Sequence, residues 1–205
     1  MKTTTEIIAK EGWKPLIINF IILLISWLLS CDLISFIAFI SFLVLIYCYY
    51  NPERIPQDVS RNTILSPIDG EIKNIETTDD GIYLEVYKSF FSHGLLRMPF
   101  AGIMNQKSSV HGLLNASPLL GERISLEFFH KDSIANVEAI LYPKFFPKSL
   151  QLYFDKTNFL MAERIGFFLN GEAKIKIPLN TKLQVCIGDK LLAGSSILGF
   201  IVNEN

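Results

Sequence analysis

The residues that could do chemistry in this chain carry no signature of a metal or nucleotide site. The cysteines, Cys31, Cys48 and Cys186, have no metal-ligand spacing, and two of them lie in or beside an apolar run, where a small hydrophobic residue is expected. No His/Cys cluster suggests zinc, and no glycine-rich loop suggests a phosphate site. We therefore expect chemistry that uses neither a bound metal nor a nucleotide.

The charge balance argues against one class of partner. The chain has 19 Lys and Arg against 20 Asp and Glu, a net charge of -1, and its basic residues are scattered. Proteins that bind nucleic acid through its phosphates need clustered Lys and Arg. We expect no nucleic-acid partner.

Seven short motifs, in order along the chain, resemble those of one enzyme family. They are KEGW at 10–13, NPER at 51–54, SPIDG at 66–70, HGLLRMPFAG at 93–102, GER at 121–123, ERIG at 163–166 and IGDKLLAG at 187–194. In this order they resemble the short, archaetidylserine decarboxylase-like form of phosphatidylserine decarboxylase, and the resemblance covers nearly the whole length. We interpret the chain as a divergent phosphatidylserine decarboxylase-related protein of phospholipid metabolism.

The resemblance implies a chemistry that depends on one hydroxyl. The family cuts its own chain at a Gly-Ser bond, and the serine becomes a pyruvoyl group that serves as electron sink when phosphatidylserine is decarboxylated to phosphatidylethanolamine. Here the expected Phe-Gly-Ser reads Asn170-Gly171-Glu172, and the stretch from Gly171 to Pro178 is one residue shorter than the family pattern. A glutamate cannot perform the acyl shift, so we expect no pyruvoyl group and no other cofactor. The one Gly-Ser pair, Gly194-Ser195, lies too near the end to be a convincing cut site.

The resemblance also assigns three further positions. Asp69 matches the catalytic Asp, although Pro-x-Asp-Gly is equally a turn sequence. Counting back from Arg97 puts Gly94, not His93, at the position of the family's catalytic His. His93 can take that role only if the loop accommodates a shift of one residue. We favour the interpretation of His93 as a partly exposed loop histidine. Arg97 matches a family arginine and could receive an anionic lipid head, or it is an ordinary surface charge.

Two apolar runs near the N-terminus predict a membrane anchor over residues 1–51. They cover 15–30 and 33–50, are separated by Cys31 and Asp32, and predict a transmembrane helical hairpin rather than a signal peptide, since no cleavage site follows. One tilted or re-entrant element is the alternative. Basic residues flank both sides, which places the rest of the chain on the cytoplasmic face of a bacterial-type inner membrane: Lys2, Lys10, Lys14, Arg54 and Arg61.

Residues 52–205 predict one mainly β domain. The expected strands are Thr63–Leu65, Glu71–Ile75, Ile82–Tyr87, Ile124–Phe129, Ile134–Leu141, Gln151–Phe154, Arg164–Leu169, Ala173–Ile177, Gln184–Ile187 and Ser196–Val202. Asn170-Gly171 predicts a tight hairpin between two of them. The segments 66–72 and 187–194 resemble the paired hairpins of barrel-sandwich hybrid domains, so we expect a compact hybrid-barrel fold.

Three functions follow from these expectations. The first is a membrane-anchored pseudoenzyme that binds an aminophospholipid headgroup or assembles with itself or with a complete decarboxylase. The second is an active decarboxylase whose pyruvoyl group arises elsewhere or comes from a partner. The third is a membrane-tethered hybrid-barrel adaptor without lipid chemistry.

Overall fold

The computed structural model describes residues 7–110, 112, 121–131, 136–144, 150–153 and 157–202. The chain forms two compact units, Met1–Glu53 and Arg54–Asn205. The first contains the helices and the second contains the strands, so the expected mainly β chain with two N-terminal apolar helices is confirmed.

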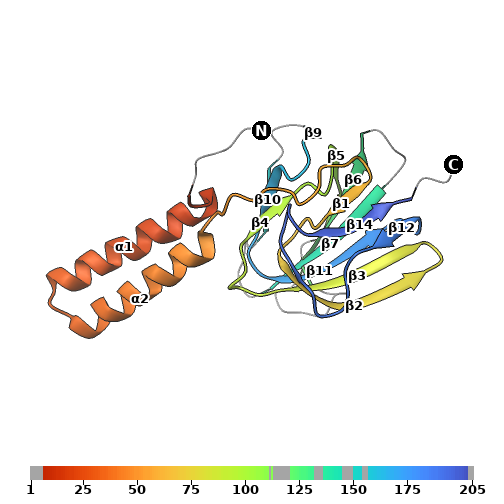
Figure 1. Cartoon of the computed structure of the whole chain (residues 1–205). Coiled ribbons are helices and arrows are strands. Elements are labelled where there is room, and N and C mark those ends of the chain that lie inside the picture. The colour runs from red at the N-terminus through yellow and green to blue at the C-terminus, as the bar shows by residue number, and fades with distance from the viewer. Residues whose placement is uncertain are drawn as a thin grey trace. The chain divides into compact units, whose positions relative to one another are not determined.

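The first unit is a helical hairpin. A short 3₁₀ turn, η1 (Lys10–Gly12), leads into α1 (Trp13–Leu28), and α2 (Asp32–Tyr49) returns beside it (Figure 1). The tight reversal between them uses Ser30 in a left-handed conformation, with φ 54°. Asp32 is the first residue of α2, at the turn, where the sequence predicts it.

Polar side chains pair the two helices while apolar ones cover the outside. Asn19 Nδ2 donates to Ser41 Oγ at 3.0 Å, and Ser35 Oγ donates to Ser26 Oγ at 3.0 Å. Such small polar contacts hold helices together where no water competes for the hydrogen bonds. Most of the large apolar side chains on both helices are exposed, and both helices are long and apolar enough to cross a membrane. This surface suggests association with a membrane.

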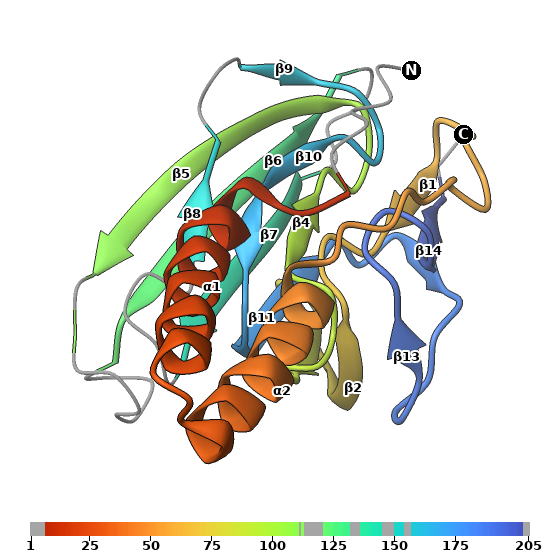
Figure 2. The same ribbon diagram turned by 90° about the vertical axis from the view of Figure 1, so that its left-hand side faces the viewer.

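The second unit contains three antiparallel sheets. The largest has the strand order β13-β2-β3-β11-β7-β6-β5-β9, and the smaller ones have the orders β4-β10-β8 and β1-β14-β12. Figure 2 shows β5, β6 and β7 side by side in the large sheet. The bounds are β1 (Thr63–Leu65), β2 (Gly70–Thr78), β3 (Gly81–Lys88), β4 (Leu95–Arg97), β5 (Gly102–Val110), β6 (Arg123–His130), β7 (Asn136–Pro143), β8 (Leu150–Leu152), β9 (Asn158–Phe159), β10 (Arg164–Phe168), β11 (Gly171–Ile177), β12 (Thr181–Leu183), β13 (Lys190–Leu191) and β14 (Ile197–Ile201).

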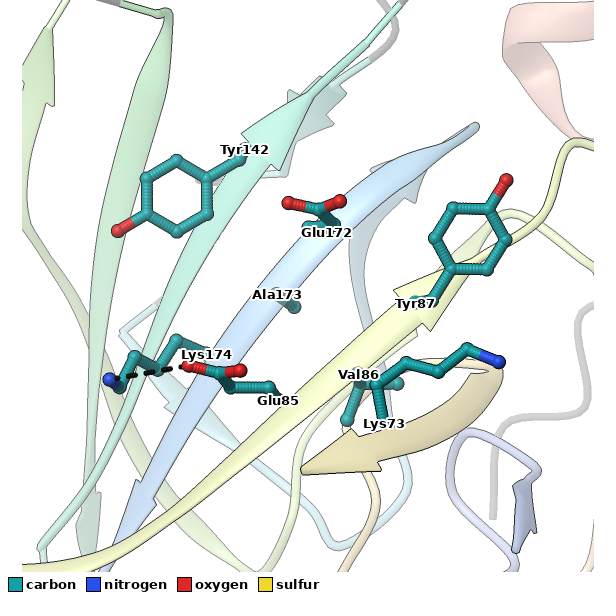
Figure 3. Close-up of a pocket in the computed structure, with 8 residues that line it drawn as sticks. All are labelled: Lys73, Glu85, Val86, Tyr87, Tyr142, Glu172, Ala173 and Lys174. Carbon is teal, nitrogen blue, oxygen red and sulfur yellow. Dashed lines mark ion pairs between the residues drawn. The ribbon is translucent and has the colours of Figure 1, made fainter. Parts of the chain in front are cut away.

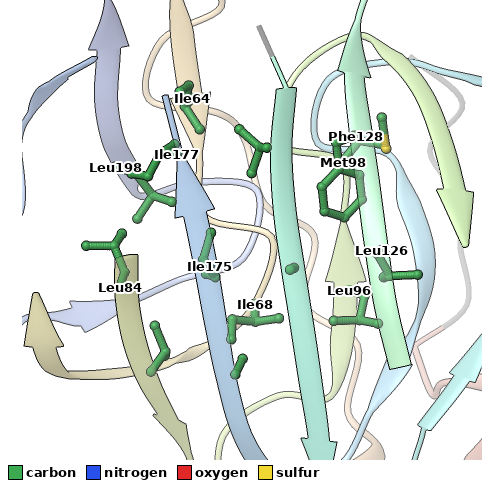
Figure 4. Close-up of a cluster of buried hydrophobic side chains, with 14 of the residues drawn as sticks. Ile64, Ile68, Leu84, Leu96, Met98, Leu126, Phe128, Ile175, Ile177 and Leu198 are labelled. Atoms are coloured by element: carbon green, nitrogen blue, oxygen red, sulfur yellow. The ribbon is translucent and has the colours of Figure 1, made fainter. Parts of the chain in front are cut away.

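One hydrophobic core joins all three sheets. Buried side chains of β3, β6 and β11 meet those of β4 and of β1 and β14 in a single cluster (Figure 4). The alternation in β11 decides its orientation, because Ala173, Ile175 and Ile177 are buried while Lys174 and Lys176 are partly exposed. The sheets do not close into a barrel, so the expected hybrid-barrel architecture is confirmed only as a mainly β fold.

Most expected strands are confirmed, but one expected strand is absent, and the strands β4, β5, β9, β12 and β13 were not expected. Residues Gln184–Ile187 do not form a strand: β12 ends at Leu183, and Asp189 Oδ2 accepts a hydrogen bond from the Cys186 backbone in a turn. The nine-residue β5 was missed because its sequence lacks an apolar alternation and most of its residues are exposed. Parts of two expected strands, residues 134–135 and 154, lie outside the described residues.

The predicted hairpin at Asn170-Gly171 is wrong. β10 pairs with β4 and β8, whereas β11 pairs with β3 and β7, so the Asn-Gly step carries the chain from one sheet to another. Asn170 does not have the positive φ that a type I′ turn requires, while Gly171 does, at 147°. A Cβ at Gly171 would lie 2.1 Å from the Tyr142 carbonyl oxygen. Glycine is needed here for close approach of two backbones rather than for a hairpin turn.

Substituting this glycine tests the close approach. We expect Gly171→Ala to lower the free energy of unfolding by about 3 kcal/mol, because strain and a backbone clash add. Gly188→Ala is a matched control, since Gly188 also has positive φ, 93°, but nothing lies within 4 Å of the added Cβ; about 1 kcal/mol is expected there. Urea unfolding in detergent, followed by circular dichroism, measures both. Equal losses would contradict the close approach at Gly171.

Candidate functional site

Asp69 lies in the turn segment 66–72, which lies beside the second turn segment, 187–194. β13 pairs with the start of β2, with Lys190 opposite Glu71 and Leu191 opposite Gly70. Backbone hydrogen bonds extend this pairing on both sides, from Gly188 N to Ile72 O and from Gly194 N to Ser66 O. Two distant parts of the chain thereby fix the turn that carries Asp69.

The Asp69 carboxylate is buried and fully engaged. Its side chain is 4% exposed. Arg54 pairs with both of its oxygens, with Nη2 donating to Oδ2 at 2.7 Å, and the backbone N–H of Ala193 donates to Oδ1 at 2.8 Å. A guanidinium fork on a carboxylate is the strongest geometry for such a pair. Asp69 is therefore more than a turn residue, and Arg54 is its principal partner.

His93 joins this cluster from a loop. It precedes β4, and its Nδ1 lies 3.6 Å from Asp69 Oδ2 and 3.3 Å from Arg54 Nη2. The expectation of a partly exposed loop histidine is confirmed, at 25% side-chain exposure, and the ring lies near Asp69. Gly94 has no room for a side chain, because its Cβ would lie 2.3 Å from the ring of Phe167.

Lys88 holds the His93 loop from inside. It is the last residue of β3 and is 1% exposed. Its Nζ donates to the carbonyl oxygens of Ser92 and His93, at 3.1 and 2.6 Å, and to Ser92 Oγ at 3.2 Å. A buried ammonium is tolerated only when its donors are satisfied in this way. We refer to Arg54, Asp69, Lys88 and His93 as the Asp69 cluster.

The cluster keeps Asp69 ionised. Burial by itself raises the pKa of the carboxyl, but hydrogen bonding with Arg54 and His93, together with the positive charges of Arg54 and Lys88, outweighs burial. The pKa of Asp69 therefore lies well below its ordinary value. A carboxylate that binds protons so weakly is a poor general base near neutral pH.

The Glu172 side chain points away from the hydrophobic interior of the β unit, the side on which the Asp69 cluster lies. In β11 it lies opposite Tyr87 on one side and Tyr142 on the other, and its side chain is 47% exposed and paired with Lys144 at 2.6 Å. These side chains line an open groove of about 620 Å³ on the outer face of the sheet (Figure 3). The position opposite the buried Lys88 is Gly171. Glu172, at the expected cleavage position, therefore points away from the buried side chains of the core.

Arg97, the predicted lipid ligand, is buried rather than a surface charge. It is 6% exposed and its Nη1 donates to the carbonyl oxygen of Ala162 at 3.0 Å. Its aliphatic stem packs against Gly194, where an added Cβ would lie 2.4 Å from Arg97 Cδ. Arg97 thus braces the final turn segment, and lipid binding through it stays a prediction.

Sequence reasoning missed Lys88 and underrated Arg54. The signal for Lys88 was present, because Ile82, Leu84 and Val86 alternate inward and position 88 continues that face. The sequence indicates Arg54 only as a basic residue flanking the apolar runs and as part of the NPER motif. Its partner Asp69 is 15 residues away, and only the fold shows that the two meet.

The fold and the site define a mainly β protein with an apolar helical hairpin and a buried, charged Asp-His-Arg-Lys cluster. The chain is similar over most of its length to curated bacterial proteins. It is 24% identical to the phosphatidylserine decarboxylase proenzyme of Desulfotalea psychrophila over 209 residues, which cover 95% of this chain and 97% of that protein. The proenzymes of Ehrlichia ruminantium (strain Gardel) and Polynucleobacter asymbioticus are 26% and 25% identical, over 95% and 94% of this chain and 91% and 94% of their own.

These similarities show a divergent, family-level relation to the phosphatidylserine decarboxylase proenzymes. No family model and no solved structure matches the chain. The resemblance first seen in seven short motifs is thereby confirmed at the level of the family.

Replacing Arg54 tests the cluster through stability. Arg54→Met strands a buried carboxylate, so we expect it to lower the free energy of unfolding at pH 7 by about 3–5 kcal/mol. The folded-state pKa of Asp69 is depressed, so this contribution is present above the unfolded pKa of about 3.9 and is lost as the pH falls below it. The deficit of Arg54→Met, measured by urea unfolding, should therefore shrink at acidic pH. Adding Asp69→Asn should recover much of the loss; a pH-independent deficit would contradict the pairing.

Proposed function

We propose that this chain is a membrane-anchored phosphatidylserine decarboxylase-related protein that does not mature into a decarboxylase. The observation that carries the proposal concerns the expected cleavage position. There Gly171 is followed by Glu172, and both lie in a strand that is paired with a neighbouring strand on each side. No hydroxyl stands there to attack the preceding carbonyl, and no pyruvoyl group can form from a glutamate. The residues present do not fit the family's prosthetic group.

The state of Asp69 supports the same proposal. The carboxylate is held by a guanidinium and a backbone N–H, and its pKa is depressed, so it is poorly suited to take a proton from an attacking group. The cluster is nevertheless complete and buried, which fits retention of the site for its structure or for binding. We propose that it serves recognition of an aminophospholipid headgroup or of a complete decarboxylase subunit.

The anchoring part of the proposal is supported by the helical hairpin. Both helices expose apolar side chains along their length, and basic residues flank them on both sides. By the distribution of these charges, the β unit belongs on the cytoplasmic face of a bacterial-type inner membrane.

Intact-mass spectrometry of the purified protein tests the absence of maturation. We expect a single chain of 23.3 kDa that does not react with a carbonyl-specific hydrazide, and no release of carbon dioxide from phosphatidylserine vesicles. A chain split near residue 171 or 194 with a carbonyl at the new N-terminus would overturn the proposal in favour of an active lyase. A bacterial proenzyme with an intact Gly-Ser bond serves as the positive control.

The orientation of Glu172 predicts how serine variants behave. Glu172→Ser should stay uncut, because its hydroxyl would face the outer groove beside Tyr87 and Tyr142. Inserting one serine between Gly171 and Glu172 would keep the register of β11 from Glu172 onward only by placing the serine opposite Lys88, where the Tyr142 carbonyl leaves no room for a Cβ. Neither variant is therefore expected to be cut, as measured by gel electrophoresis and mass. Cleavage of Glu172→Ser alone would show that the side chain at 172 reaches the cluster.

A further inference from the structure

Glu172 lies between two tyrosines on the outer face of the large sheet. In β11 it is opposite Tyr87 of β3 and Tyr142 of β7. Neighbouring strands are about 5 Å apart, so each tyrosine lies next to the carboxylate along one cross-strand row. Figure 3 shows the two rings on either side of Glu172, at the open groove of about 620 Å³. We refer to Tyr87, Glu172 and Tyr142 as the tyrosine–glutamate row.

The tyrosine–glutamate row attracts positive charge, as the chain's own lysines show. Lys144 Nζ lies 2.6 Å from Glu172 Oε1, and Lys73 Nζ lies 5.9 Å from the centroid of the Tyr87 ring. The carboxylate carries a negative charge, and the face of an aromatic ring attracts cations through its quadrupole. Two ammonium groups therefore lie at the row, one at the carboxylate and one at a ring.

Both lysines hold these positions weakly. Glu172 is 47% exposed and Lys144 is 31% exposed, and an ion pair exposed to this degree contributes little free energy. Lys73 has another partner, because its Nζ pairs with Glu71 at 2.6 Å. A cation from solution that the rings bind better than they bind an ammonium group can therefore displace both lysines.

The hydration of the cation decides which class of ligand fits. A primary ammonium is strongly hydrated and gains little by leaving water for an open groove. A quaternary ammonium has no N–H group to hydrate, carries its charge on methyl groups and binds to the faces of aromatic rings. The two tyrosines supply such rings, and Glu172 supplies the opposite charge.

We propose that the tyrosine–glutamate row binds a quaternary ammonium group, such as that of choline. The site lies on the outer face of the sheet and uses no member of the Asp69 cluster. It depends neither on the proposed absence of maturation nor on the membrane anchor.

Saturation-transfer difference NMR tests the site, with choline chloride as the probe. The full-length protein is kept in dodecyl maltoside, a detergent without an ammonium group, and the trimethyl signal is followed through a titration that gives the Kd. Ethanolamine, which has the same carbon chain but a primary ammonium, is titrated at the same pH and ionic strength. We expect choline to bind about threefold more tightly than ethanolamine.

Substitutions in the row and at Lys144 should have opposite effects. Glu172→Gln, Tyr87→Leu and Tyr142→Leu should each weaken choline binding about threefold, because one charge or one ring is lost. Lys144→Ala should instead strengthen binding about twofold, because its ammonium no longer competes for Glu172. Loss of a side chain that only stabilises the fold would not strengthen binding.

Tyr83→Leu is the matched control. Tyr83 lies on the same face of β3 as Tyr87, but it is opposite Lys176 rather than Glu172, and Lys174 Nζ lies 4.8 Å from the centroid of its ring. Choline binding should not change in this variant.

The two variant effects decide between the outcomes. Weaker binding after substitution in the row, together with stronger binding in Lys144→Ala, supports the site. The proposal is overturned by no choline binding in both the native protein and Lys144→Ala, or by unchanged or weaker binding in Lys144→Ala. It is also overturned by an equal loss in Tyr83→Leu, or by equal binding of ethanolamine, since either shows general attraction of cations to the sheet.

Discussion

The two-sided pairing of β11 is the constraint on which the rest of the β unit depends. This strand lies between β3 and β7, and it contributes Ala173, Ile175 and Ile177 to the core that joins the three sheets. A shift of one residue would turn these side chains out and bring lysines in, so the register cannot slip. The direction of every side chain on the strand, including Glu172, follows from the burial of those three.

This constraint also fixes the start of the strand at Gly171. There the Tyr142 carbonyl lies against Gly171 and leaves no room for a Cβ. The Asn170 side chain beside it is buried, and its Oδ1 has no hydrogen-bond partner within the described part of the chain. A buried amide oxygen in that state costs stability, so this junction between two sheets is locally unfavourable.

The Asp69 cluster places charged and titratable side chains inside the β unit. The side chains of Arg54, Asp69 and His93 come together from separate segments, and the almost completely buried Lys88 holds the loop of His93. Burying such groups is costly unless they are paired. Here Arg54 pairs with the Asp69 carboxylate, and Lys88 donates to the carbonyl oxygens of the loop. The same pairing that makes the cluster stable also makes Asp69 a weak base.

The sequence by itself determined the elements whose signals are local. The helical hairpin follows from two uninterrupted apolar runs around Asp32, and most strands follow from period-two alternation, because burial of one face is written into consecutive residues. The family relation also came from the sequence, through short motifs. Only the tertiary structure decided which segments meet: that Asn170-Gly171 joins two sheets instead of closing a hairpin, that Arg54 rather than His93 is the main partner of Asp69, and that Glu172 points outward. The physical reason is that pairing partners and side-chain contacts are set by a core assembled from distant strands, and no local pattern records them.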